Sequence, residues 1–233
     1  HGELVTFGAV ATWWINVDHD VPLIPAAIAG MVIGGVVGAL NETLLWRRLR
    51  RRGMSLPAMM IVSIGLSVAA RNLLQIQFGA STAPYNDYVI QRGVDIGPIT
   101  SAPKDLWIIG IIVATMVGVA LMLQRSRIGK AMRAVSDNPD LAASSGIDVD
   151  RVVLYAWIAG GSLAALGGIL FAIGDRVQFN MGFQLLLLMF AGVTLGGLGT
   201  AYGALVGSFV VGMFIQVSTL VVPTELKNAG ALA

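Results

Sequence analysis

Residues 152–174 read VVLYAWIAGGSLAALGGILFAIG and contain no charged side chain. A helix needs about 20 mostly apolar residues to cross the hydrocarbon core of a bilayer, so this run predicts one membrane-spanning helix. Further uncharged runs lie at residues 4–17, 21–41, 53–70, 106–123 and 177–224. The last run is long enough for two crossings joined by a turn. We therefore expect an all-α integral membrane protein, a polytopic helical bundle of about seven membrane segments in a single domain over residues 1–233.

The composition supports this fold class and excludes several others. Charged residues make up 12% of the chain and hydrophobic residues 56%, and the mean hydropathy is +0.78. A soluble domain carries about twice that share of charge. The chain has no cysteine and two histidines, so disulfide scaffolds and the usual thiol, haem and soft-metal centres lack their ligands. No P-loop sequence is present, and we expect this chain to bind no metal or cofactor of its own.

The basic residues predict the orientation of the helices. The loops 46–55 and 124–151 each carry five arginines or lysines, whereas the loops 78–105 and 175–182 carry three between them. Because Lys and Arg near segment ends favour the cytoplasmic side, we expect the first two loops to be cytoplasmic and the other two to face outward. We interpret the arginines of 46–55 as a topology anchor that touches anionic lipid, rather than as a nucleic-acid site. They are Arg47, Arg48, Arg50, Arg51 and Arg52.

Two ionisable side chains lie at the boundaries of uncharged runs. Arg71 follows the run 53–70 and Glu42 follows the run 21–41, and we interpret both as boundary residues that reach toward the membrane surface. We expect no Asp, Glu or His at the centre of a membrane segment. This expectation argues against a proton-coupled pump and an intramembrane hydrolase, because both need titratable groups within the membrane.

Stripes of small residues predict close helix packing, because in lipid they let helix backbones approach one another. The stripes are Gly30, Gly34 and Gly38; Gly160, Ala164 and Gly168; and Gly203 and Gly207. The dense glycines of 192–203 instead weaken a helix. Two interpretations stay open for that stretch: a broken or re-entrant segment lining a transport path, or a tight turn.

The loop 124–151 contains the signals of a short helix. Asn138 suits an N-cap, Pro139 the first helical position and Gly146 the residue beyond the end, which predicts a helix over 139–145. Asp148 is placed to cap the membrane helix that follows. Such a helix is either a rigid lever between membrane segments or an amphipathic loop on the lipid surface, and the local sequence does not decide between them.

Four motifs follow one another along the chain. They are HGE at 1–3 with FGA at 7–9; SIGLS at 63–67; GKAMRA at 129–134 with NPDLAA at 138–143, GI at 146–147 and DRV at 150–152; and the glycine-rich block 190–207. Together they resemble the permeases of branched-chain amino acid ABC transporters, most closely the H-type subunit. The third motif resembles the coupling loop of that family. The resemblance covers most of the chain.

The resemblance implies an ATP-driven importer of the prokaryotic plasma (inner) membrane, in which this chain forms the translocation path and catalyses no reaction. The implied partners are a second permease subunit (M-type or another copy), two cytosolic ATPase subunits that hold ATP and magnesium, an extracytoplasmic substrate-binding protein and the lipid bilayer, with no nucleic acid. The residues expected to contact an ATPase are Asn138, Pro139, Asp140, Leu141, Ala142, Ala143 and Gly146. The residues expected along the translocation path are Ser63, Ser67, Gly192, Gly196, Gly197 and Gly199.

Several points stay open beside this resemblance. The substrate is a branched-chain amino acid, another amino acid, urea or an amide, and the alternative function is an ATP-independent secondary transporter or channel for a small polar solute. The family usually has one more helix before the HGE segment and one after the last residue, so we expect the chain to be truncated at both ends. Leu188 stands where the family often has lysine.

Overall fold

The computed structural model describes residues 1–79, 83–86, 94–96, 99–197 and 201–218. The chain forms two compact units, His1–Gly182 and Phe183–Ala233. Four helices in the described part of the chain are long and apolar enough to span a membrane, two shorter apolar helices accompany them, and a further helix of 12 residues covers Gly2–Trp13. The expected all-α membrane bundle with about seven segments is confirmed.

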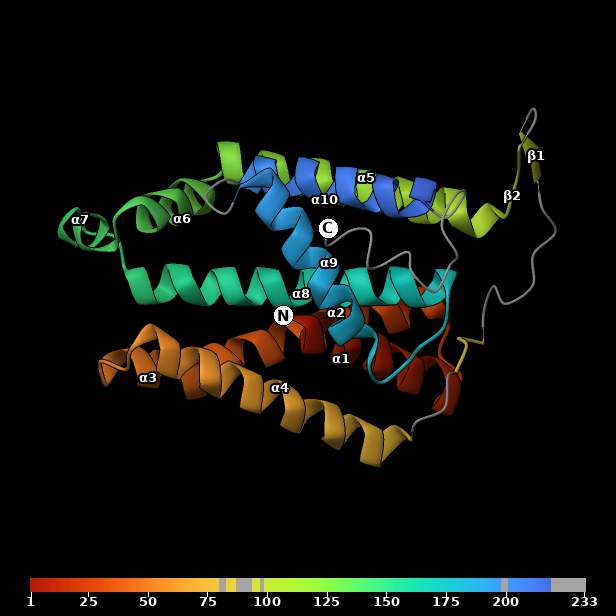
Figure 1. Cartoon of the computed structure of the whole chain (residues 1–233), viewed down its shortest axis with the longest axis horizontal. Coiled ribbons are helices and arrows are strands. Elements are labelled where there is room, and N and C mark those ends of the chain that lie inside the picture. Colours follow the sequence, from red (N-terminus) through yellow and green to blue (C-terminus); the bar gives the residue numbers. More distant parts are fainter. Residues whose placement is uncertain (80–82, 87–93, 97–98, 198–200, 219–233) are drawn as a thin grey trace. The chain divides into compact units, whose positions relative to one another are not determined.

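The first unit consists of helices and one small hairpin (Figure 1). Its elements are α1 (Gly2–Trp13), π-helical η1 (Trp14–Asp18), α2 (Leu23–Leu40), π-helical η2 (Asn41–Trp46), α3 (Arg47–Arg51), α4 (Leu56–Phe78), β1 (Val94–Ile96), β2 (Ile99–Ser101), α5 (Pro103–Arg125), α6 (Arg127–Asp137), α7 (Pro139–Ser144) and α8 (Val149–Gly174). The antiparallel hairpin β1–β2, within the loop 78–105, was not predicted from the sequence.

The helix boundaries follow local sequence signals. Proline occupies the first turn of α4, α5 and α7, where its missing N–H leaves no hydrogen bond unmade. Gly53 and Gly79 follow the ends of α3 and α4 with φ of +66° and +80°, a backbone conformation that favours glycine. Helix α4 continues to Phe78, so Arg71 lies two turns inside the helix rather than at its end, and the boundary predicted there is wrong.

The core of the first unit is the packing of α1, α2 and α8, which lie side by side in Figure 1. The stripe predicted on α2 is confirmed, because a Cβ on Gly34 would lie 2.7 Å from the carbonyl oxygen of Gly161. On α8, Gly161 and Ala165 make the close contacts in place of the predicted Gly160 and Ala164, whereas the predicted Gly168 is confirmed, since its Cβ would meet the Val5 carbonyl oxygen of α1. The spacing of the stripe therefore differs from the prediction, because which residues of α8 are buried depends on the faces that meet α1 and α2.

The connections at the end of the first unit opposite α7 are tied to the helices. Ala83 and Val177 form a β-bridge with N···O distances of 3.1 and 3.0 Å, which joins the loop 78–105 to the turn after α8. The Tyr85 hydroxyl, on a residue 3% exposed, donates to the Ala9 carbonyl at 3.1 Å. Burial raises the pKa of the Tyr85 phenol above its ordinary value, which by itself already keeps the hydroxyl protonated at neutral pH.

The second unit contains most of α9 (Met181–Gly196) and the whole of α10 (Ala201–Ser218). A Cβ on Gly192 would lie 2.7 Å from the Cα of Ser208, and a Cβ on Gly196 would meet the backbone of Gly203. These glycines therefore allow α9 and α10 to cross closely. Gly197 follows α9 with φ of +93°, the usual arrangement after a helix end, whereas Gly199 lies outside the described residues.

Candidate functional site

Helix α7 is capped at both ends by the residues that the sequence indicated. The Asn138 side chain accepts a hydrogen bond from the Leu141 N–H at 3.0 Å. At the other end Gly146 has φ of +85°, and the Ile147 N–H donates to the Ala142 carbonyl at 3.0 Å. The Asp148 side chain then caps α8 through the Arg151 N–H at 3.1 Å. The helix predicted over 139–145 is confirmed, and it ends at Ser144.

Most of the residues proposed for ATPase contact are exposed on α7 and its flanks. Leu141 is 65% exposed, whereas Ala142 is 4% exposed and anchors α7 against its own chain. Ala142 is therefore a packing residue in this chain. The positions that remain available to a partner are Asn138, Pro139, Asp140, Leu141, Ala143 and Gly146.

Helix α6 leads into α7 and was not predicted as a separate element. Ser126 caps it by accepting a hydrogen bond from the Gly129 N–H at 2.8 Å. Gly129 lies so close to the end of α5 that a Cβ there would collide with the Leu123 and Met122 carbonyl oxygens. Arg133 of α6 donates to the same Leu123 carbonyl. These contacts fix α6 at the end of α5, and they explain the glycine that begins the motif GKAMRA.

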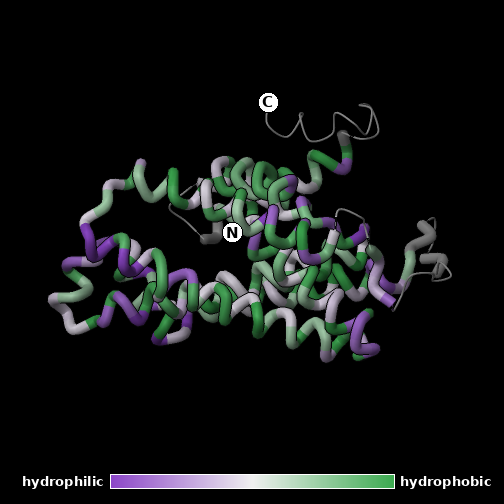
Figure 2. Tube along the Cα trace, turned by 90° about the horizontal axis from the view of Figure 1, so that it is seen from below, coloured by the Kyte–Doolittle hydropathy of each residue, from purple (hydrophilic) through white to green (hydrophobic). Residues whose placement is uncertain are grey.

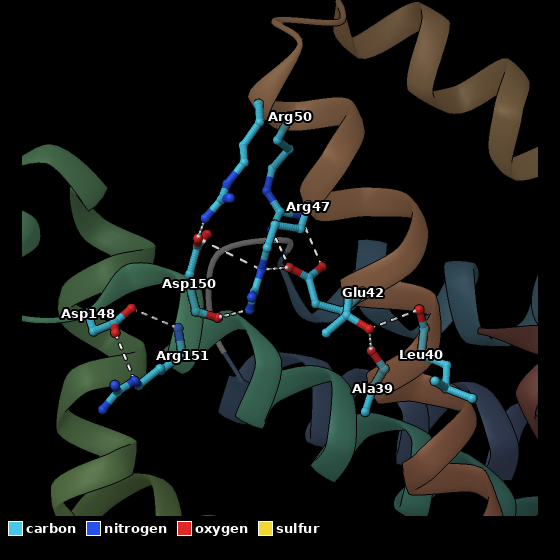
Figure 3. Close-up of polar contacts among 10 residues, drawn as sticks. Ala39, Leu40, Glu42, Arg47, Arg50, Asp148, Asp150 and Arg151 are labelled. Carbon is cyan, nitrogen blue, oxygen red and sulfur yellow. Dashed lines mark hydrogen bonds and ion pairs between the residues drawn. The ribbon is translucent and has the colours of Figure 1, made fainter.

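An ion-pair network joins the start of α8 to η2 and α3 (Figure 3). Arg51 donates to the Asp150 carboxylate at 2.7 Å, and Arg47 donates to the Asp150 main-chain carbonyl at 3.1 Å. Arg50 contacts both oxygens of Glu42, one of them at 3.1 Å. Arg47 lies between the two carboxylates, 3.8 Å from each. We name Glu42, Asp150, Arg47, Arg50 and Arg51 the arginine network.

This network corrects one expectation from the sequence. Glu42 is fully buried and ion-paired, so it does not reach toward the membrane surface. Three of the five clustered arginines form ion pairs within the chain, but Arg48, Arg50, Arg51 and Arg52 are all exposed, and the contact of the cluster with lipid headgroups stays a prediction. The network also shows that the loops 46–55 and 124–151 meet at one end of the first unit, where Figure 2 shows many hydrophilic residues.

A cavity of about 470 Å³ lies between α1, α2 with η2, and α4. Ser63 and Ser67, both predicted along the translocation path, line it together with Glu3, Trp46 and Trp157. Ser67 is the central residue of α4, and its hydroxyl donates to Glu3 Oε1 at 2.8 Å. Arg71 donates to the same oxygen at 3.2 Å.

The expectation that no acidic residue occupies the centre of a membrane segment is not contradicted by Glu3, which lies in the first turn of α1, but its carboxylate lies beside the middle of α4. The reason is geometric: α1 begins along the length of α8, as the stacking of His1 on Trp157 shows, with ring centroids 5.2 Å apart. Residue 3 is thus brought beside the middle of α4 instead of the end of a membrane segment. Gly192, Gly196 and Gly197 belong to the second unit, and their place on a translocation path stays a prediction.

Comparison with known proteins shows the family to which the chain belongs. The family described as branched-chain amino acid transport system, permease component, matches residues 1–232. The chain belongs to this permease family. It is therefore a transport subunit, similar to the permeases of branched-chain amino acid ABC transporters. No solved structure matches the permease.

Three relatives illustrate the range of the similarity. The high-affinity branched-chain amino acid transport system permease protein LivH of Escherichia coli K12 is 25% identical, over all of this permease and 79% of its own length. BraD of Pseudomonas aeruginosa, with the same description, is 24% identical over 91% and 71% of the two chains. The ribose import permease protein RbsC of E. coli K12 is 24% identical over 90% and 64%.

Proposed function

We propose that this permease imports a branched-chain or related amino acid across the inner membrane of a prokaryote, driven by ATPase subunits that bind α7. The observation that carries the proposal is α7 itself: a short helix capped at both ends, with a 65% exposed leucine, at the polar end of a membrane bundle. An exposed apolar side chain on a rigid element is suited to a protein contact.

The arginine network supplies the proposed transmission of force. A displacement of α7 moves the first turn of α8, because only the four residues 145–148 separate the two helices. Asp150 of that turn carries the displacement to Arg47 and Arg51, and hence to α3, η2 and α2. The close contact of Gly34 with Gly161 makes α2 and α8 move as one body. ATP binding drives transport in this scheme by favouring one of two conformations.

The proposed partners follow from the family and from the chemistry of this chain. Two cytosolic ATPases would hold ATP and magnesium, a second permease subunit would complete the path, and a binding protein would deliver the substrate at the outer end. Amino acids are favoured over sugars as substrates by the description of the family that matches residues 1–232. The similarity to a ribose permease makes this choice a point for experiment.

Reconstitution into liposomes tests the proposal. We expect uptake of L-leucine only when the binding protein is outside and ATP is inside, together with the ATPases and both permease subunits. Uptake driven by an ion gradient without ATP would instead support the alternative, a secondary transporter or channel. Uptake of ribose but not leucine under the same conditions would retain the ATP-driven mechanism and reject the substrate class.

A further inference from the structure

Glu3 uses only part of its capacity to accept hydrogen bonds. Its Oε1 atom accepts from Ser67 and from Arg71, whereas its Oε2 atom is buried and has no hydrogen-bond partner among the described residues. Trp46 lines the same cavity, and its indole N–H is likewise buried without an acceptor in the described chain. Buried polar atoms are rarely left unpaired, and such atoms beside a cavity indicate a bound ligand or water.

The remaining lining of the cavity is mainly apolar. It includes Leu4, Phe7, Val37, Leu40 and Leu66. A carboxylate oxygen without a donor is complementary to an ammonium group, an indole N–H is complementary to a carboxylate, and the apolar wall is complementary to an aliphatic side chain. An amino acid with a branched aliphatic side chain carries all three groups, and a volume of about 470 Å³ is ample for it.

We propose that this cavity is a binding site for the transported amino acid, with its ammonium group on Glu3 Oε2 and its side chain against Leu4, Phe7 and Leu66. This inference rests on the proposed import function. Ser67 and Arg71 act as positioning residues, because they hold the other oxygen of Glu3 and so direct Oε2 to the ligand. Glu42 provides the contrast, since Arg50 contacts both of its oxygens and leaves neither for a ligand.

The absence of cysteine from the chain makes a direct test possible. In the assembled complex, S63C places a thiol on the cavity lining, and I64C places one on the outer face of α4, where Ile64 is 62% exposed and does not line the cavity. A charged, water-soluble methanethiosulfonate is then applied and modification of this chain is measured by mass. We expect S63C to react and I64C, facing lipid, to stay unmodified. Equal modification of the two would overturn the proposal.

Protection by ligands identifies the groups that the site recognises. L-Leucine and leucinol, which both have an ammonium group, should slow modification of S63C, and isocaproate, which lacks it, should not. E3Q should weaken protection by leucine about tenfold, the loss expected for one hydrogen bond to a charged group, while modification without ligand keeps its rate. That unchanged rate reports an intact cavity.

The outcomes separate this inference from the function on which it rests. A complex that imports leucine with ATP but shows no protection of S63C would overturn the binding site alone. Protection by isocaproate as strong as that by leucine, or unchanged protection in E3Q, would overturn the role of Glu3. A complex that imports no amino acid with any partner would overturn the proposed function itself.

Discussion

The arginine network near α7 and the cluster of Glu3, Ser67 and Arg71 beside the cavity, here named the Glu3 cluster, both contain a carboxylate paired with arginine, but the two carboxylates differ in how completely they are paired. In the network Glu42 is completely buried, both its oxygens are engaged, and the partner arginines come from the helix that directly follows it. In the cluster Glu3 has one engaged and one unpaired oxygen, and its partners come from a different helix. A fully paired carboxylate fixes helices in place, whereas a half-paired one keeps the capacity to bind.

This comparison predicts separable defects. Changes at the α7 end should disconnect ATP hydrolysis from transport and leave ligand protection in the cavity intact. Changes in the Glu3 cluster should weaken ligand binding and leave the ATPase contact intact. The following substitutions test each side of that division.

The largest effect is expected at Gly146. G146R should abolish ATP-dependent uptake while the subunit still inserts, because the residue has positive φ and a large side chain would obstruct the ATPase contact. A Cβ at Gly146 would meet no described atom of this chain within 4 Å, so bulk alone does not disturb the fold. G146N is the matched control, since asparagine tolerates positive φ, and it should retain most uptake. Full uptake by G146R would count against the α7 contact.

Loss of the buried carboxylate of Glu42 should affect the stability of the subunit more than its rate of transport. E42Q leaves Arg50 without its counter-charge and removes one of the two carboxylates beside Arg47, and it should lower the free energy of unfolding by about 2 kcal/mol, less than for a fully buried pair because the arginines are partly exposed. Thermal unfolding in detergent measures the change. D148N, which removes an exposed pair with Arg151, is the control and should change stability by less than about 0.5 kcal/mol. Equal losses of stability in E42Q and D148N would refute the distinction between the buried ion pair and the exposed one.

The close contact between α2 and α8 fixes the relative position of Glu42, which follows α2, and Asp150, which lies in α8. G161A should destabilise the subunit by about 2 kcal/mol, because its methyl group would collide with the backbone of Gly34. G160A is adjacent in sequence and meets only the His1 ring at 3.8 Å, so it should be neutral within about 0.5 kcal/mol. The same thermal assay compares them, and a larger loss in G160A would show that the stripe register is wrong.

A smaller effect is expected from reversing one ion pair. D150R should lower ATP-dependent uptake about tenfold, equivalent to about 1.4 kcal/mol of coupling free energy, because it repels Arg47 and Arg51. The double variant D150R/R51D should recover most of that loss, because it restores an opposite pair at the same place. Uptake rates in liposomes provide the measurement. No recovery in the double variant would indicate that charge pairing is not the means of transmission.

The sequence predicted the features that depend on local chemistry. Uncharged runs located the membrane helices, and Asn138, Pro139 and Gly146 located α7, because caps act on the nearest backbone groups. Helix α6 was missed because its charged residues interrupt the apolar runs, although Ser126 is a readable N-cap. The extension of α4 beyond Arg71 was missed for the same reason.

The features that depend on distant contacts could not be predicted. Glu42 and Asp150 share Arg47 although they are far apart in the chain, and nothing local to either residue indicates this pairing. The partnership of Glu3 with Ser67 and Arg71 depends on how far along the bundle α1 begins. The candidate cavity thus contains two predicted serines, but its charged group emerged only from the fold.

Cross-linking from Leu141 tests the central claim most directly. The variant L141C, carrying a photoreactive label in the assembled importer, should cross-link to an ATPase subunit, since this side chain is 65% exposed on α7. The matched control is I128C with the same label, because Ile128 on α6 is 45% exposed, and it should give little cross-linked product with the ATPase. Strong cross-linking to the ATPase from Leu141 alone is the predicted result. A label at Leu141 that reacts only with lipid, in a complex that still imports leucine with ATP, would contradict the account.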